Sequence, residues 1–132
     1  MVSISGLPAF LSYVAVALGL VALYLGVYLT ATAHREIALI RDNNVAAAMA
    51  LGGSLIGYTL PLSVAIFNAQ SVLDCVIWGL VALVFQILVY FLVLLAIPNL
   101  SARIEAGQLA PAILLAAASF AAGVVDAASM TY

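Results

Sequence analysis

Long apolar segments alternate with short polar ones along the chain, and this pattern predicts its helices. A bilayer core of about 30 Å needs about 20 helical residues, because each residue adds about 1.5 Å to a helix. Four apolar stretches are each long enough to cross such a core once. The sequence therefore predicts an all-α integral membrane protein, with transmembrane helices at about residues 9–32, 44–66, 72–97 and 109–130.

The composition places this chain in lipid. Of its 132 residues, 68% are apolar and 6% are charged, whereas soluble domains average about 45–50% apolar and about 25% charged residues. In water such a chain would expose large apolar patches and aggregate. Three Arg, no Lys and five acidic residues give a net charge of −2, which excludes a basic nucleic-acid binder. We therefore expect the lipid bilayer as a partner and no nucleic acid.

The positions of the arginines predict the orientation. All three lie in the connections after the first and third predicted helices, and loops rich in Arg and Lys face the cytoplasm. Both termini are therefore predicted outside. A cleaved signal peptide is the competing interpretation of the first helix, because Ala31, Thr32 and Ala33 have the small-x-small form of a cleavage site. However, no Lys or Arg precedes this apolar segment, which is also longer than a signal-peptide core.

Two sequence matches predict an internal duplication. The segment Gly19–Leu23 recurs unchanged as Gly79–Leu83, and residues 40–48 align with residues 104–112. The two matches differ in register by about one helical turn. Two spans per repeat return the chain to its starting side, so the halves would share one orientation. We predict a single domain, residues 1–132, built as two parallel two-helix repeats at about residues 9–66 and 72–130.

Small residues occupy one face of the second and fourth predicted helices. They recur at positions i, i+4, i+7 and i+11, and small side chains let helix backbones approach closely. This pattern predicts close helix packing, or alternatively the lining of a narrow path or a subunit contact. The candidate packing residues are Gly53, Gly57, Ser119 and Gly123.

Two aspartates fall within or beside the predicted spans. Asp126 lies about one turn before the end of the fourth helix, where it would either reach the outer interface or bind a proton or cation inside the bundle. Asp74 completes a capping pattern with Ser71, in which a carboxylate satisfies free backbone N–H groups at the start of the third helix. Both aspartates are near the same membrane surface, so the topology allows a shared site.

Further polar groups are predicted in the membrane interior. Pro61 lacks a backbone N–H and so frees the carbonyl of Gly57, which can form a packing kink, a cation site or a hinge. Gln86 and Tyr90, four residues apart on one face, are expected to hydrogen-bond to neighbouring helices. The candidate residues for an ion or proton path, or for lining a pore, are Asp126, Asp74, Gln86, Gly57 and Pro61.

The connections after the first and third helices carry the remaining charges. Residues 35–42, which include Glu36, predict a short amphipathic turn, and residues 103–105 repeat this pattern. They form either solvated loops or a docking surface, for which the candidate residues are Arg35, Arg41 and Arg103. Because His34 is the only His and Cys75 the only Cys, the sequence predicts no metal site, no reactive thiol and no cofactor.

Several short segments together resemble a known family. They include Gly57–Ser63, Asn68, Asp74, Trp78, Gln86 and the ending Asp126–Tyr132. The order and spacing of these segments are similar to those of the bacterial inner-membrane family called domain of unknown function 350, the YjfL-type proteins. The resemblance covers nearly the whole chain. This resemblance implies a four-span inner-membrane protein with an internal two-helix repeat and, through neighbouring genes, an association with envelope stress. Family members carry Asn at the position of Asp126, so the resemblance does not extend to that carboxylate.

These features favour a non-enzymatic function. The sequence has no nucleophile beside a His, no paired carboxylate with a base and no phosphate-binding loop on a strand. The preferred hypothesis is an oligomeric channel-like or transporter-like bundle for a small ion or solute, with the second and fourth helices lining the path. The alternative hypothesis is a membrane scaffold or envelope-stress protein that recruits a cytoplasmic stress-response partner through its inner loops.

Overall fold

The computed structural model describes residues 4–32 and 36–130. Within these residues there are four long helices and two short ones, and a 3-10 turn at Ile4–Gly6 precedes the first. The helices are α1 (Leu7–Ala31), α2 (Glu36–Arg41), α3 (Val45–Asn68), α4 (Val72–Ala96), α5 (Leu100–Glu105) and α6 (Leu109–Ser129). The four long helices are each long and apolar enough to cross a membrane. Their bounds confirm the four predicted spans to within a few residues.

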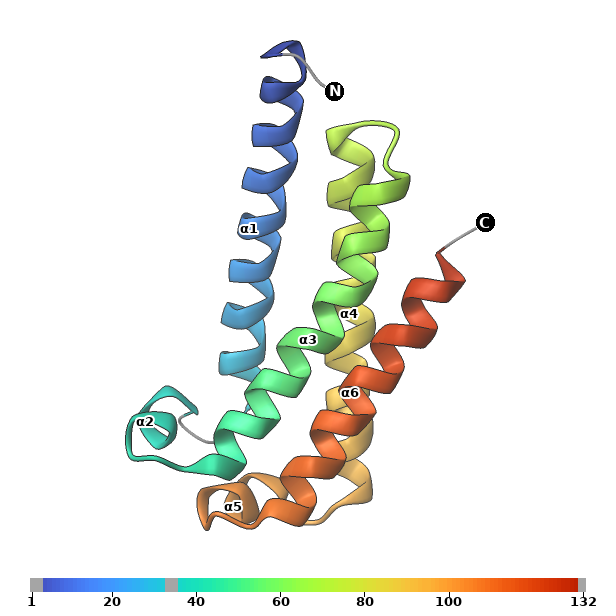
Figure 1. The fold of residues 1–132 in the computed structure, drawn as a ribbon. Coiled ribbons are helices and arrows are strands. Elements are labelled where there is room, and N and C mark those ends of the chain that lie inside the picture. The colour runs from blue at the N-terminus through green and yellow to red at the C-terminus, as the bar shows by residue number, and fades with distance from the viewer. Residues whose placement is uncertain (1–3, 33–35, 131–132) are drawn as a thin grey trace.

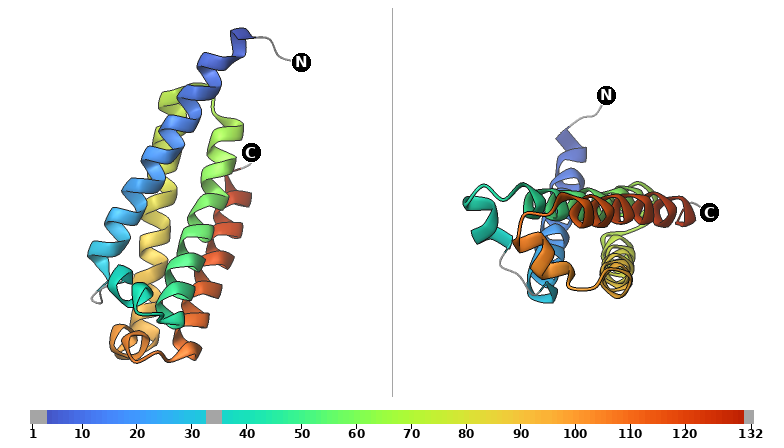
Figure 2. Two further views of the ribbon diagram at one scale, coloured as in Figure 1. Left: turned by 60° about the vertical axis from the view of Figure 1, so that its left-hand side comes forward. Right: turned by 90° about the horizontal axis from the view of Figure 1, so that it is seen from below.

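The long helices run alternately in opposite directions (Figure 1). The first residues of α1, the turn between α3 and α4, and the last residues of α6 lie toward one end of the bundle, which we call the terminal end. The short helices α2 and α5 lie together at the opposite end, which we call the short-helix end (Figures 1 and 2).

Side-chain caps fix where two of the long helices begin. The Asn44 side chain accepts a hydrogen bond from the N–H of Ala47 at 2.9 Å, and its amide donates to the carbonyl of Ile104 in α5 at 3.1 Å. At the start of α4, the Ser71 hydroxyl accepts from the N–H of Asp74 at 3.1 Å, as the capping pattern predicts. These caps satisfy backbone donors that have no partner within a helix. The Asn44 bonds also tie the two halves together at the short-helix end.

The most extensive helix contact joins α3 and α6, which run side by side in the same direction (Figure 2). Glycine makes this close approach possible at three positions. A Cβ on Gly53 would lie 2.6 Å from the Cα of Ala116, and one on Gly57 would lie 2.7 Å from the carbonyl carbon of Ser119. A Cβ on Gly123 would lie 2.9 Å from the carbonyl carbon of Gly57. The four residues singled out for helix packing therefore lie in the contact between α3 and α6.

Helix α1 lies at the side of the bundle and buries little of its surface. Its buried side chains are Leu20, Tyr24 and Tyr28, which face α3 and α4. Leu20 fills the space beside Gly79 on α4, where a Cβ would lie 2.5 Å from a methyl carbon of Leu20. The first half of α1 is mostly exposed, and its apolar side chains suit contact with lipid. The first long helix of each half is therefore packed differently. Helix α4 packs against α1, α3 and α6, whereas α1 contacts mainly α3 and α4.

Both halves contain a long helix, a short helix and a second long helix. After each short helix, one residue has a left-handed backbone, namely Asn43 with φ of 66° and Gly107 with φ of 81°. These two positions coincide when Ile40 is aligned with Ile104. This correspondence agrees with the predicted repeat, although the duplication itself stays a prediction.

The close contact between α3 and α6 makes a testable prediction about glycine. Replacing Gly123 with Ala should lower the free energy of unfolding by about 1–3 kcal/mol, because the new methyl group would collide with the backbone of Gly57. The effect can be measured by unfolding the purified protein in mixed detergent micelles and following its helical circular dichroism.

Gly52→Ala is the matched control, because a Cβ on Gly52 would meet no atom within 4 Å. That substitution should raise the free energy of unfolding by up to about 1 kcal/mol, because Ala favours a helix interior over Gly. Equal effects at Gly52 and Gly123 would contradict the proposed role of the α3 and α6 contact.

Candidate functional site

The interior of the bundle contains a backbone carbonyl that has lost its usual donor within the helix. Pro61 continues α3 but cannot donate a hydrogen bond to the carbonyl of Gly57, four residues earlier. The side chain of Gln86 on α4 supplies the missing donor, since its Nε2 lies 2.9 Å from the Gly57 oxygen. Gln86 is only 1% exposed. The structure thus brings together three of the residues that the sequence marked for an ion or proton path.

Helix α6 also packs against the Gly57 carbonyl, beside α3 and α4. Gly123 packs directly against the Gly57 peptide group, where no larger residue would fit. Helices α3, α4 and α6 therefore meet at one point, which we call the Gly57 site and define by Gly57, Pro61, Gln86 and Gly123. The backbone oxygen is buried and polar, yet the surrounding packing leaves little room around it.

Two buried acceptor oxygens near this level have no hydrogen-bond partner among the described residues. They are Oε1 of Gln86 and Oδ2 of Asp126. Asp126 is 9% exposed and lies three residues after Gly123 on α6, or about 4.5 Å further toward the terminal end. An unpaired buried acceptor is costly, so each oxygen is a candidate contact for a proton, a cation or water.

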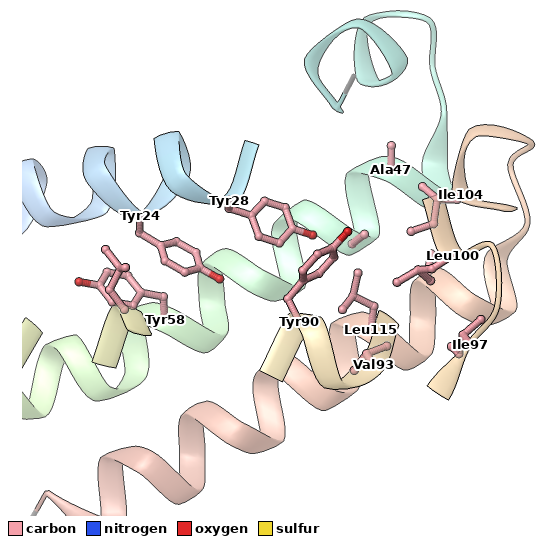
Figure 3. Packing of buried hydrophobic residues seen from close by; sticks show 14 of the residues in the cluster. Tyr24, Tyr28, Ala47, Tyr58, Tyr90, Val93, Ile97, Leu100, Ile104 and Leu115 are labelled. Carbon is pink, nitrogen blue, oxygen red and sulfur yellow. The ribbon is translucent and has the colours of Figure 1, made fainter. Parts of the chain in front are cut away.

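A row of tyrosines continues the polar interior toward the short-helix end (Figure 3). Tyr24 of α1 stacks on Tyr58 of α3, with ring centroids 4.5 Å apart and planes within 8°. Tyr28 of α1 meets Tyr90 of α4 edge to face, with centroids 5.5 Å apart. All four rings are at most 2% exposed. The aromatic contacts attach α1 to the rest of the bundle.

Two of these tyrosine hydroxyl groups have hydrogen-bond partners inside the bundle. Tyr24 shares a hydrogen bond with Ser54, and the Tyr58 hydroxyl donates to the Gly79 carbonyl at 2.9 Å. The buried Tyr28 hydroxyl has no hydrogen-bond partner among the described residues. Sequence reasoning missed the role of Tyr24 and Tyr28 in this row. Their spacing of four residues, which puts them on one helix face well inside a predicted span, was the available signal.

Asp74 lies apart from the Gly57 site, at the start of α4. Its Oδ2 accepts a hydrogen bond from the backbone N–H of Gln70 at 3.1 Å, while its own N–H donates to Ser71. The Asp74 side chain also lines a cavity at the terminal end. Among the described residues, no hydrogen bond joins the side chains of Asp74 and Asp126. A site shared by these two aspartates therefore stays a prediction.

Two of the candidate docking residues, Arg41 and Arg103, lie at the short-helix end. Arg41 is exposed, and Arg103 donates from Nε to the side chain of Gln108 at 2.8 Å. Arg35, like His34, lies outside the described residues. The predicted short turns are the helices α2 and α5, and Glu36 at the start of α2 is buried. Its side chain is 2% exposed, because α2 turns it inward toward the tyrosine row.

The described residues also show how potential metal ligands and the Cys75 thiol are placed. No three His, Cys, Asp or Glu side chains within residues 4–32 and 36–130 are grouped so that they could hold a metal ion. Cys75 is a buried free cysteine on α4. A buried thiol is shielded from reagents and typically acts as a small apolar residue.

The sequence matches the family described as Domain of Unknown Function (DUF350) over residues 1–130. It is 40% identical over 129 residues to a protein of Escherichia coli strain K12 named UPF0719 inner membrane protein YjfL, and the match covers 98% of each chain. The same identity and coverage relate it to the protein of that name from Escherichia coli O157:H7. No solved structure matches the chain.

The hydrogen bond at the Gly57 site can be tested by a double-mutant cycle. Gln86→Leu removes the donor to the Gly57 carbonyl and should cost about 1 kcal/mol of stability. In a Pro61→Ala background the new backbone N–H can bond to the same carbonyl, so the Gln86→Leu penalty should fall toward zero. The measurement is the free energy of unfolding of the four variants in mixed micelles.

Gln70→Leu provides the matched control, because Gln70 is exposed in the turn between α3 and α4. It should leave the stability nearly unchanged in both backgrounds. Additive penalties for Gln86→Leu and Pro61→Ala would show that the two residues do not act on one carbonyl.

Proposed function

The chain belongs to the DUF350 family, and on that premise we propose that it is a multi-pass inner-membrane protein that assembles into oligomers and passes a small ion or solute. The family assignment and the name of its relative support the membrane location. The proposed function is not enzymatic, since the interior polar groups serve as contacts for a permeating species. With Arg41 and Arg103 at the short-helix end, that end faces the cytoplasm and both termini face outward.

The pair of unpaired acceptors on Gln86 and Asp126 is the observation that carries this proposal. Leaving a buried acceptor without a donor costs about 1–3 kcal/mol. A bundle built only for anchoring would gain stability from an apolar residue in place of Asp126. An acceptor oxygen without a protein donor suits a proton or a small cation that visits the site. Polar groups inside a membrane span are functional candidates for this reason.

Conduction through one chain alone conflicts with the close packing of α3 and α6, so the proposal requires an oligomer. The exposed face of α1 offers a contact surface for it. Small residues recur there at the spacing seen on α3, and a Cβ on Gly19 or Gly26 would meet no atom within 4 Å. Such a face allows another helix to approach closely. The exposed small residues are Ala15, Gly19, Ala22 and Gly26.

A scaffold function is the second candidate, and a groove at the short-helix end favours it. This groove has a volume of about 520 Å³ and is lined by residues that include Asn43, Glu105 and Gly107. It opens beside the α2 and α5 turns, on the side assigned to the cytoplasm. A partner held there would make the interior polar groups structural, and ion flux would then be absent.

The transport proposal is tested by reconstituting the purified protein in liposomes and measuring the flux of protons, Na⁺ and K⁺. Asp126→Asn and Gln86→Leu should each change the flux of the permeating ion about tenfold, because a lost contact of about 1.4 kcal/mol changes a rate tenfold. Asp42→Asn and Gln70→Leu make the same chemical changes at exposed positions and should leave the flux unaltered.

The result that sinks the transport proposal is flux no higher than that of empty liposomes, from protein shown to be folded and inserted. Flux that both interior variants leave unchanged would equally exclude the Gly57 site as part of the path. The first of these outcomes favours the scaffold function.

A further inference from the structure

A cavity of about 370 Å³ opens at the terminal end, where the ends of three long helices meet. Its walls are formed by Asn68 at the end of α3, Gln70 in the turn, Asp74 and Trp78 on α4, and Met130 after α6. A second space of about 30 Å³, the size of a water molecule, shares Asn68, Asp74, Trp78 and Met130 and extends the cavity between neighbouring side chains of α3. The cavity is thus a defined space rather than a flat surface.

The polar groups around this cavity suit a cation. The Asp74 carboxylate has accepted one backbone N–H at Oδ2, and a carboxylate can accept further donors. The Asn68 amide donates from Nδ2 to the Met130 carbonyl at 3.5 Å, which leaves its Oδ1 as an acceptor. The carboxyl-terminal ends of α3 and α6 both point here and carry the negative ends of their dipoles.

No compensating positive side chain lies beside Asp74 in the described part of the chain. Arg41 and Arg103 are at the short-helix end, on the far side of the bundle. The positive end of the α4 dipole favours the Asp74 carboxylate, but it supplies only a partial charge. A bound cation would supply the missing charge.

Trp78 and Met130 give the cavity an aromatic and an apolar wall, which suit an organic cation. The indole ring attracts ammonium groups through its electron-rich face, and both side chains offer apolar surface to an alkyl chain. A bare metal ion would gain little from these two side chains. A primary ammonium group can also donate up to three hydrogen bonds, which matches the acceptors of Asp74 and Asn68.

We propose that this cavity binds a small primary ammonium group carried on a short alkyl chain, with Asp74 as its charge partner and Trp78 as its aromatic wall. Such a group occurs in soluble amines and in the headgroup of phosphatidylethanolamine, so either can present the recognised chemistry. The site is separate from Gln86 and Asp126, and it holds whether or not the protein transports ions.

Trp78 is the only tryptophan in the chain, so intrinsic fluorescence reports on this cavity directly. Titrating the full chain in detergent with ethanolammonium chloride, against sodium chloride at the same ionic strength, should change its emission saturably. Asp74→Asn should weaken this binding about tenfold or more. Asp42→Asn, an exposed acid at the short-helix end, is the matched control and should bind as the wild type does.

A second arm tests the lipid source. The wild-type chain in nanodiscs of phosphatidylethanolamine should differ in Trp78 emission from the same chain in phosphatidylcholine, whose quaternary ammonium cannot donate hydrogen bonds. Asp74→Asn should abolish that difference, while Asp42→Asn should keep it. A response confined to ethanolammonium assigns a soluble amine, and a response confined to the nanodiscs assigns the headgroup.

Asp74→Asn keeps a side-chain oxygen that can accept the Gln70 N–H, so the start of α4 should remain capped. If circular dichroism nevertheless shows loss of helix, Asn68→Leu replaces it and should weaken the response in the same direction. The proposal is overturned if the wild-type emission responds in neither arm, or if the responses survive in the folded Asp74 variant. These results leave the flux prediction untouched, because that prediction depends on other residues.

Discussion

The close approach of α3 and α6 is the constraint on which the remaining structure depends. Gly57 and Gly123 let the two backbones touch, and a side chain on either residue would separate them. Within lipid no hydrophobic force drives helices together, so this contact must come from van der Waals packing and buried hydrogen bonds. Once α3 and α6 are paired, α4 can cover them from one side and α1 is left at the side of the bundle.

The same contact explains why the polar interior is arranged around one carbonyl. Pro61 removes the intrahelical donor of Gly57, and Gly123 lets α6 pack directly against that peptide group. Gln86 can then reach the Gly57 oxygen at 2.9 Å. A proline break, a glycine face and one long amide side chain thus act as a unit. The proline break and the amide side chain would each be unfavourable in a membrane helix without the other.

The two ends of the bundle differ in charge, and the difference follows from the directions in which the long helices run. Helices α3 and α6 both end at the terminal end, where Asp74 adds a negative charge. The described arginines lie at the opposite end, beside the short helices. One end therefore suits cationic ligands, whereas the other presents Arg41 and an open groove. This polarity would persist in any assembly of parallel copies.

The sequence by itself determined the four long helices, the short turns that precede the second and fourth of them, and the Ser71 cap, because these depend on local apolar length, charge and capping. Asp126, Gln86 and Pro61 were also recognisable, since polar residues and proline are rare within spans. Only the tertiary structure decided that Gln86 meets the Gly57 carbonyl and that Tyr24 and Tyr28 join an interior row. It also decided that Glu36 is buried. These features depend on which faces of separate helices meet, and that choice arises from long-range packing rather than from local sequence.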